Sequence, residues 1–167
     1  MGHIEHKKMA PKNIKCAVIT VSDTRTEEQD SSGNAIVELL AAAGHEPVYN
    51  GIVKDETEQI KNKLDEMIKS NEIQTIILNG GTGVGKRDIT IEVVVPKLDK
   101  VLPGFGELFR MLSYEEIGSA AIMSRAIAGV ISGKPVFCLP GSEKACRLAM
   151  NKLIIPELGH LLLEVSK

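Results

Sequence analysis

Residues Ile73 to Asp88, IQTIILNGGTGVGKRD, join a buried-strand pattern to a glycine-rich loop that carries two cations and a carboxylate. Residues 73–78 are apolar and largely β-branched, which predicts a strand, and the glycines that follow end it sharply. The loop therefore leaves the carboxyl end of a strand, where open α/β sheets bind ligands. Gly80, Gly81, Gly83 and Gly85 exceed the needs of a tight turn and let backbone N–H groups approach an anion. The segment predicts a phosphate-binding loop.

Two common nucleotide-binding motifs do not fit this loop. Gly80, Gly85 and Lys86 have the spacing of a P-loop, but Arg87 stands where a P-loop has the Ser or Thr that binds Mg²⁺. The dinucleotide pattern G-x-G-x-x-G fails as well, because Lys86 takes the place of its third glycine. A P-loop NTPase is therefore only a distant interpretation of the chain.

The segments around the loop predict alternating strands and helices. Before the loop we expect strands at residues 14–21 and 48–53, and helices at residues 34–43 and 55–68. After the loop we expect helical structure at 90–98 broken by Pro96, a turn at 103–106, a short helix at 107–112, strands at 127–131 and 135–139, and a helix from 143 to 154 or beyond. Such alternation predicts an α/β fold with helices on both faces of a parallel sheet.

Length and composition restrict the function classes. A chain of 167 residues predicts one domain, which we place at residues 14–167 after a flexible extension at 1–13 that contains His3 and His6. The net charge of −2 and the absence of Trp argue against nucleic acid as a partner. No run approaches the ~18 apolar residues of a membrane span, so we expect no membrane partner.

Cysteine usage predicts a reducing compartment. Cys16, Cys138 and Cys146 are odd in number and lack C-x-x-C spacing. Cys16 and Cys138 lie in apolar runs and are interpreted as small core residues. We therefore expect the protein in the cytoplasm.

Several ordered motifs, spread over about residues 14 to 160, resemble the MoaB/MogA family of molybdenum cofactor biosynthesis proteins. They are Val21-Ser22-Asp23-Thr24-Arg25, Asp30-Ser31-Ser32-Gly33, Asn79-Gly80-Gly81-Thr82-Gly83 with Arg87-Asp88-Ile89-Thr90, Pro103-Gly104-Phe105-Gly106-Glu107, Ser124-Arg125-Ala126 with Ala128-Gly129, and Leu139-Pro140-Gly141-Ser142. The resemblance implies a three-layer αβα molybdopterin-binding fold with a mostly parallel sheet.

The resemblance also implies a reaction. In this family ATP adenylylates the terminal phosphate of molybdopterin and pyrophosphate is released, with Mg²⁺ as cofactor, ahead of metal insertion. The partners implied are molybdopterin, ATP, further copies of the chain in a homotrimer or homohexamer, and a metal-insertion protein that takes over the product. A phosphate monoester has a second pKa near 6, so the attacking phosphate is largely anionic at pH 7 and requires no His or Cys base.

By this resemblance Asp55 and Asp88 are catalytic and hold Mg²⁺, since carboxylates at neighbouring strand ends suit a hard cation. The residues implied in substrate binding are Ser22, Asp23, Gly80, Gly81, Thr82, Gly83, Arg87, Ser124, Arg125, Pro140, Gly141 and Ser142. Structural alternatives stay open: Asp55 and Ser142 are placed as helix caps are, and Asp88 could cap a helix or pair with Lys86 or Arg87.

One departure from the family pattern supports an alternative function. Thr90-Ile91-Glu92-Val93 stands where the family commonly has Thr-Pro-Glu-Ala. The alternative is a catalytically inactive molybdopterin-binding carrier or assembly partner.

An apolar stretch bears on assembly. Leu108, Phe109, Met111 and Leu112, with Ala120 to Met123, form more apolar surface than a short peripheral helix usually buries. These residues either complete the domain core or form an interface, and the resemblance favours the interface.

Overall fold

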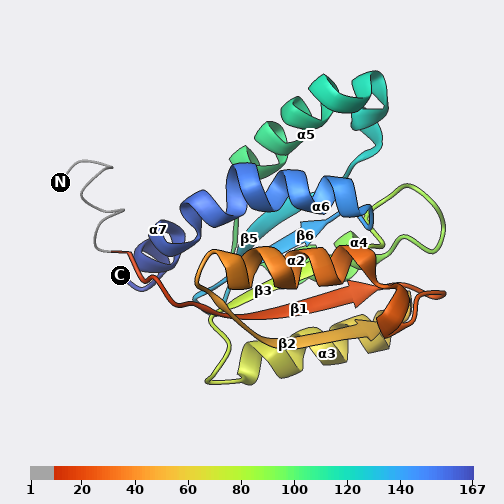
Figure 1. The fold of residues 1–167 in the computed structure, drawn as a ribbon. Helices are drawn as coiled ribbons and strands as arrows, with labels where there is room; N and C mark the ends of the chain where they lie inside the picture. The colour runs from red at the N-terminus through yellow and green to blue at the C-terminus, as the bar shows by residue number, and fades with distance from the viewer. Residues whose placement is uncertain (1–9) are drawn as a thin grey trace.

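The strands predicted on both sides of the glycine loop lie in one sheet (Figure 1). The computed structural model describes residues 10–167. The strands are β1 (Lys15–Val21), β2 (Glu46–Val53), β3 (Thr75–Asn79), β4 (Lys100–Val101), β5 (Ile127–Ile131) and β6 (Lys134–Leu139). Their order is β2-β1-β3-β6-β5-β4. Strands β2, β1, β3 and β6 are parallel to one another. Strand β5 is antiparallel to both of its neighbours, β6 and β4. The sheet is therefore mostly parallel, as predicted.

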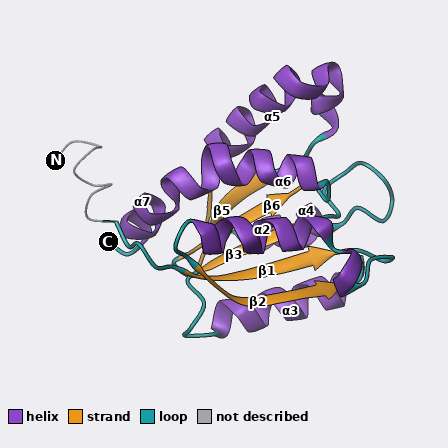
Figure 2. Cartoon of the chain, viewed as in Figure 1, coloured by secondary structure: helices purple, strands orange, loops and turns teal. Residues whose placement is uncertain are grey.

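Helices cover both faces of the sheet, which confirms the three-layer α/β fold (Figure 2). One face carries α2 (Ser31–Ala42), α5 (Pro103–Ile117), α6 (Glu143–Ala149), the π-helix η4 (Met150–Ile154) and α7 (Ile155–Val165). The other face carries α3 (Thr57–Lys69) and α4 (Thr90–Val94). Short 3-10 helices complete the chain: η1 (Glu27–Gln29), η2 (Val95–Lys97) and η3 (Gly118–Met123).

Strand β1 shows how the sequence builds two cores. Its side chains alternate between the faces, as the period of a strand requires. Cys16 and Val18 pack in the core under α2 and α6, whereas Ala17 and Ile19 pack in the core under α3. A strand buried on both faces reads as a continuous apolar run, and this is the pattern that predicted β1.

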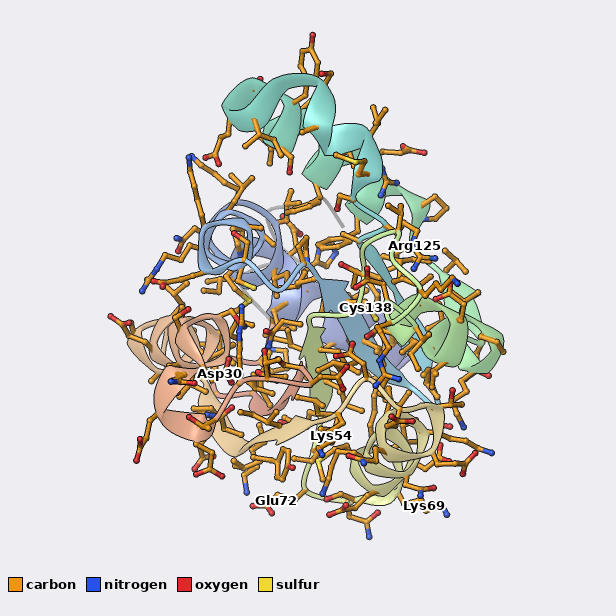
Figure 3. The ribbon with its side chains drawn as sticks, turned by 90° about the vertical axis from the view of Figure 1, so that its right-hand side faces the viewer. Asp30, Lys54, Lys69, Glu72, Arg125 and Cys138 are labelled. Atoms are coloured by element: carbon orange, nitrogen blue, oxygen red, sulfur yellow. The ribbon has the colours of Figure 1, made fainter. Side chains whose placement is uncertain are left out.

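The three cysteines are free and buried, which confirms the prediction that Cys16 and Cys138 are core residues. Cys138 lies in the sheet between the two helix layers (Figure 3). Burial raises the pKa of each of the three thiols to about 12. The thiols are therefore protonated and unreactive at neutral pH.

The turn predicted at residues 103–106 was wrong, whereas the helix predicted at 107–112 is confirmed as part of a longer helix. Pro103 to Gly106 were expected to form a turn, but they are the first residues of α5, which continues to Ile117. Proline is favourable in the first turn of a helix, where its missing N–H is not needed. Gly106 is a packing requirement, since a Cβ there would lie 2.9 Å from the Ala126 carbonyl oxygen.

Other boundaries move by a few residues. Helix α2 begins at Ser31 rather than Asn34, because the Asp30 side chain caps it by accepting the Gly33 N–H. Strand β3 begins at Thr75 rather than Ile73. The helical structure expected at 90–98 divides just before Val95 into α4 and η2, with Pro96 inside η2, and the two-residue strand β4 was not predicted.

Most of the predicted N-terminal extension, including His3 and His6, falls on residues 1–9 and lies outside the described residues. Residues 10–12 run along α7, where a Cβ at Gly159 would lie 2.7 Å from the Pro11 carbonyl oxygen. None of the helices in residues 10–167 has the length and apolar character of a membrane span.

Thr75→Val is expected to raise the free energy of unfolding by about 1–2 kcal/mol. Within residues 10–167, Thr75 Oγ1 is the one buried side-chain polar atom that has no hydrogen-bond partner, and Val replaces it with a group of similar shape. Urea denaturation measures the change. Thr90→Val is the matched control and should lower stability, because the buried Thr90 hydroxyl donates to the Gly80 carbonyl at 2.8 Å. Lower stability in Thr75→Val would contradict the prediction.

Candidate functional site

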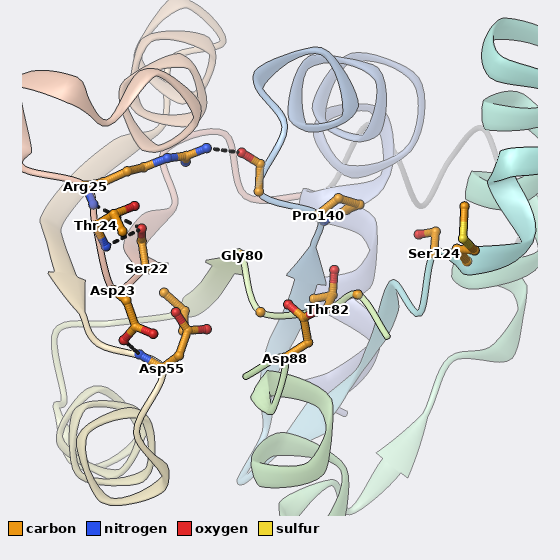
Figure 4. A pocket seen from close by; sticks show the side chains of 15 residues that line it. Ser22, Asp23, Thr24, Arg25, Asp55, Gly80, Thr82, Asp88, Ser124 and Pro140 are labelled. Atoms are coloured by element: carbon orange, nitrogen blue, oxygen red, sulfur yellow. Dashed lines mark hydrogen bonds between the residues drawn. The ribbon is translucent and has the colours of Figure 1, made fainter. Parts of the chain in front are cut away.

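The carboxyl ends of β1, β2, β3 and β6 meet around one pocket of about 500 Å³ (Figure 4). Each strand is followed by predicted site residues. The predicted residues that line the pocket are Ser22, Asp23, Asp55, Gly80, Gly81, Thr82, Gly83, Asp88, Ser124, Pro140 and Gly141. Residues from five separate segments are thus brought together at the edge of the sheet where α/β folds bind ligands.

The glycine loop turns sharply where β3 ends. Gly80 and Gly81 have φ values of +93° and +67°, a region that L side chains rarely adopt. A Cβ at Gly80 would overlap the Val21 carbonyl oxygen, so glycine is required there by space as well. The Gly80 N–H donates to the Leu139 carbonyl at 3.0 Å, and the Gly81 carbonyl accepts the Thr90 N–H at 3.0 Å. The start of the loop is therefore held rigidly.

The next N–H groups remain available for a ligand. In the described part of the chain, no acceptor pairs with the backbone N–H of Gly81, Thr82 or Gly83. All three residues line the pocket. Successive N–H groups of this kind form an anion-binding concavity that suits a phosphate.

Asp55 places a nearly buried carboxyl group in the pocket, with the residue 9% exposed. Burial raises its pKa, and the negative charges of Asp23 and Asp88 raise it further. The structure contradicts the alternative that Asp55 caps a helix, because the N-cap residue of α3 is Glu56. Asp55 is therefore an acid held in a site that disfavours its charge, which is common where a cation or a substrate supplies the compensation.

Asp88 folds back over the glycine loop. One of its carboxylate oxygens, Oδ2, accepts the Gly85 N–H at 2.8 Å. Its structural alternatives are not found: the N-cap residue of α4 is Ile89, Arg87 pairs with other acids, and no ion pair among the described residues joins Asp88 to Lys86. Asp88 thus closes the turn and also presents its charge to the pocket.

Arg87 lies at the rim and does not line the pocket. Its guanidinium donates to both oxygens of Asp23, at 2.9 and 3.0 Å, and to Glu56 at 3.0 Å. The hydrogen bond from Arg87 is the largest cause that lowers the pKa of Asp23. Arg87 therefore ties the tip of the glycine loop to the segments that follow β1 and β2.

Arg125 and Ser142 also lie outside the pocket lining. Arg125 donates to the carbonyls of Gly83, at 2.8 Å, and Asp88, at 3.0 Å, and it pairs with Glu92. Arg125 therefore holds the glycine loop in place through its backbone carbonyls. The Ser142 hydroxyl accepts the Ala145 N–H and caps α6, which was the structural alternative for this residue.

Four residues that line the pocket were not predicted as site residues: Val21, Thr24, Arg25 and Met123. Arg25 lines it from the segment after β1, and Met123 lines it from the end of η3. Arg25 could have been selected, since it belongs to the same segment as Ser22 and Asp23. Met123 carries no chemical signal of a site, and only the fold places it beside Ser124.

The carboxylates fit a cation that the substrate helps to hold. Across the residues that the structure describes, no three His, Cys, Asp or Glu side chains stand close enough to hold a metal alone. Magnesium is usually bound by one or two carboxylates together with substrate phosphates. Asp55 and Asp88, beside the free N–H groups of the glycine loop, are a donor set of that kind.

Fold and site together define an α/β domain with a pocket that suits a small phosphorylated molecule, and comparison with known proteins agrees with this class. Residues 17–160 match the family described as "Probable molybdopterin binding domain". The chain is 53% identical to Molybdenum cofactor biosynthesis protein B of Bacillus cereus, over 100% of this chain and 99% of that protein.

Solved structures agree as well. The crystal structure of a Molybdenum cofactor biosynthesis protein B has 53% identity and a TM-score of 0.91, covering 94% of this chain and 98% of the other. The tungsten cofactor synthesizing protein MoaB from Pyrococcus furiosus has 43% identity and a TM-score of 0.85, covering 95% and 100%. The chain belongs to the MoaB/MogA family of molybdenum cofactor biosynthesis proteins.

Proposed function

We propose that the protein transfers AMP from ATP to the terminal phosphate of molybdopterin, with release of pyrophosphate, in a reaction that depends on Mg²⁺. The observation that carries the proposal is the meeting of Asp55 and Asp88 with the unpaired N–H groups of Gly81, Thr82 and Gly83 in one pocket. Acids and anion-binding groups side by side suit a cation shared between carboxylates and phosphates.

The reaction requires positioning and charge neutralisation more than proton transfer. The attacking phosphate is already largely anionic at pH 7, so the pocket does not need a His or Cys base. The N–H groups of the glycine loop would bind a phosphate and orient it for attack. Asp55 and Asp88 would hold Mg²⁺, which when bound neutralises part of the crowded negative charge.

The position of the site in a pathway belongs to the same proposal. The adenylylated product would pass to a metal-insertion protein. We place the step in the cytoplasm, because the three cysteines are free thiols and such thiols persist in reducing compartments.

The test is a reaction of the purified protein with molybdopterin, ATP and Mg²⁺. The proposal requires that adenylylated molybdopterin and pyrophosphate form in equal amounts and that EDTA stops both. The alternative, an inactive carrier, requires that molybdopterin binds while no pyrophosphate is released. The support for the carrier is that Ile91 stands where the family commonly has proline. However, α4 still begins at Thr90, and the Thr90 hydroxyl still donates to the Gly80 carbonyl. The loop geometry therefore favours the enzyme.

Assembly as a homotrimer or homohexamer is part of the proposal. Helix α5 extends from the body of the domain (Figure 1). Phe109 on α5 is buried in the domain core, whereas Leu108 and Met111 are 48% and 53% exposed. Ile122 and Met123 on η3 are exposed by 82% and 52%. The apolar stretch thus serves the core only in part, and its exposed residues are of the types common in interface cores.

Light scattering behind size exclusion is expected to give a mass of three or six chains. Closed symmetry is expected because an open contact would polymerise. The variant Ile122→Glu should shift the mass towards one chain, since a buried charge without a partner disfavours association. A mass of 18.1 kDa for the unmodified protein at micromolar concentration would contradict the assembly.

A further inference from the structure

A buried polar network lies beneath the pocket and has no part in the chemistry described so far. It contains Thr20, Ser32 and Asn79, which are fully buried, and Asp30, which is 2% exposed. The Thr20 hydroxyl donates to Asp30 Oδ2 at 2.6 Å and accepts from Asn79 Nδ2 at 2.9 Å. The Ser32 hydroxyl donates to Asn79 Oδ1 at 2.7 Å. The network thus joins the ends of β1 and β3 to the start of α2.

The motif Asp30-Ser31-Ser32-Gly33 is the source of this network. Asp30 Oδ1 accepts the Gly33 N–H at 3.0 Å, which caps α2. A Cβ at Gly33 would overlap Asp30 Oδ2, so the glycine is needed for the carboxylate to fit. Residues 30–33 thus hold a carboxylate in a buried position. A buried carboxylate is costly in free energy unless a cation lies beside it.

Arg25 is the cation that meets the network. Its Nη1 donates to the Ser32 hydroxyl and lies 3.6 Å from Asp30 Oδ1. Its Nη2 donates to the Gly141 carbonyl at 2.6 Å. Figure 4 shows the side chain crossing from the segment after β1 to the segment after Pro140. The guanidinium is therefore held in place from two sides of the pocket.

Arg25 keeps binding capacity for a ligand. Its side chain is 29% exposed, and it is the one Lys or Arg among the pocket-lining residues of the described chain, beside three aspartates. Asp30 is satisfied by Thr20 and Gly33, and its 3.6 Å separation from Arg25 exceeds the ~2.7–2.9 Å of a charge-assisted hydrogen bond. A guanidinium carries five N–H donors, and the two hydrogen bonds described use only part of them.

We infer that Arg25 binds a phosphate oxygen of a polyphosphate ligand, a nucleoside triphosphate or its pyrophosphate product, and that Asp30 is the positioning residue that orients Arg25. The pocket then has two phosphate-binding parts. One is formed by the glycine loop with Asp55 and Asp88, and the other by Arg25 on the wall between the segments after β1 and β6. The inference rests on the proposed function in taking the ligand to be a polyphosphate.

Titration calorimetry with inorganic pyrophosphate, and separately with ATP and Mg²⁺, tests the role of Arg25. Arg25→Gln is expected to weaken both affinities about tenfold or more, because a hydrogen bond to a charged group is lost. Arg25→Lys should fall between, since Lys keeps the charge but cannot reach Gly141 and Ser32 together. Arg147→Gln is the matched control, because Arg147 pairs with Glu38 and Glu143 on the outside of α6 and loses the same charge. Unchanged affinity in Arg25→Gln would overturn the assignment.

The role of Asp30 is tested by a double-mutant cycle. Asp30→Asn should weaken pyrophosphate binding in the unmodified protein and have no further effect in Arg25→Gln, because Asp30 acts through Arg25. An equal loss of pyrophosphate affinity in the unmodified protein and in Arg25→Gln would mean that Asp30 has only a structural role, and would overturn its assignment as a positioning residue. If Asp30→Asn does not fold, Ser32→Ala serves in the same cycle, since Ser32 is the other anchor of Arg25.

The outcomes separate this inference from the proposed function. If no AMP transfer is found but Arg25→Gln still weakens pyrophosphate binding, the proposed reaction fails and the Arg25 site stands. If AMP transfer is found and Arg25→Gln changes neither the KM for ATP nor the pyrophosphate affinity, the Arg25 site alone fails.

Discussion

Asp88→Asn is expected to slow AMP transfer by on the order of 10²-fold or more, with little change in stability. Asn keeps an oxygen that can accept the Gly85 N–H, which Asp88 now accepts at 2.8 Å, so the loop retains its shape. The substitution removes only the negative charge, which the proposed mechanism uses to hold Mg²⁺ and to arrange the phosphates. The rate of pyrophosphate release with molybdopterin and ATP measures the effect.

Asp99→Asn is the matched control for this experiment. Asp99 likewise accepts a backbone N–H, from Ser132 at 2.7 Å, but it does not line the pocket. Its replacement should leave the transfer rate unchanged. An Asp88→Asn protein that transfers AMP at the parental rate would show that the charge of Asp88 has no part in the reaction.

Asp55→Asn is expected to lower activity on the same scale while raising stability at neutral pH. The carboxyl of Asp55 is nearly buried, and burial followed by the charges of Asp23 and Asp88 raises its pKa. Its ionised form is therefore less favourable in the folded chain than in the unfolded one, and an uncharged Asn avoids that cost. A gain in stability together with a loss of activity is typical of a residue retained for function.

The pH dependence of this gain has a definite sign. A carboxyl whose pKa is raised by folding destabilises the protein only where it is ionised. The excess stability of Asp55→Asn should therefore be largest above the raised pKa and should vanish as the pH falls below about 4, the usual pKa of Asp. Melting temperatures of both proteins between pH 4 and pH 8 measure it.

Asp23→Asn provides a control of opposite sign. The hydrogen bond from Arg87 is the largest cause that lowers the pKa of Asp23, so its ionised form is favoured by folding. Its replacement should lower the melting temperature slightly at neutral pH, and that loss should fade in acid. A lower melting temperature for Asp55→Asn at pH 7 would contradict the proposed origin of the raised pKa.

The parts of the fold that could be predicted are those with a local physical signal. Strand β1 and the glycine loop were predicted because runs of buried residues and clusters of glycine are recognisable without any partner. The resemblance implied that Ser22, Asp55, Gly80 and Pro140 share one site. The fold explains why they meet, since each lies at the end of a strand and parallel strands end at the same edge of the sheet.

The parts that could not be predicted depend on contacts distant in the sequence. The substrate role that the resemblance implies for Arg125 stays a prediction, but nothing in the sequence indicated that Arg125 also holds carbonyls 37 to 43 positions away. No local pattern distinguishes an arginine that binds substrate from one that binds a loop. The prediction at the start of α5 failed for a related reason. Gly104 and Gly106 indicate a turn locally, whereas Gly106 is explained by its close packing against Ala126.

The bond between Arg25 and the Gly141 carbonyl spans 116 positions of the chain. During synthesis, β1, β2, β3 and the glycine loop are complete long before residue 141 leaves the ribosome. A nascent or C-terminally truncated chain therefore possesses the phosphate loop but lacks one whole wall of the pocket, and a chain that ends before Arg125 lacks the clamp on the loop too. A fragment that ends before residue 141 therefore lacks the carbonyl that fixes Arg25, and the pocket is complete only in a chain that continues past that residue.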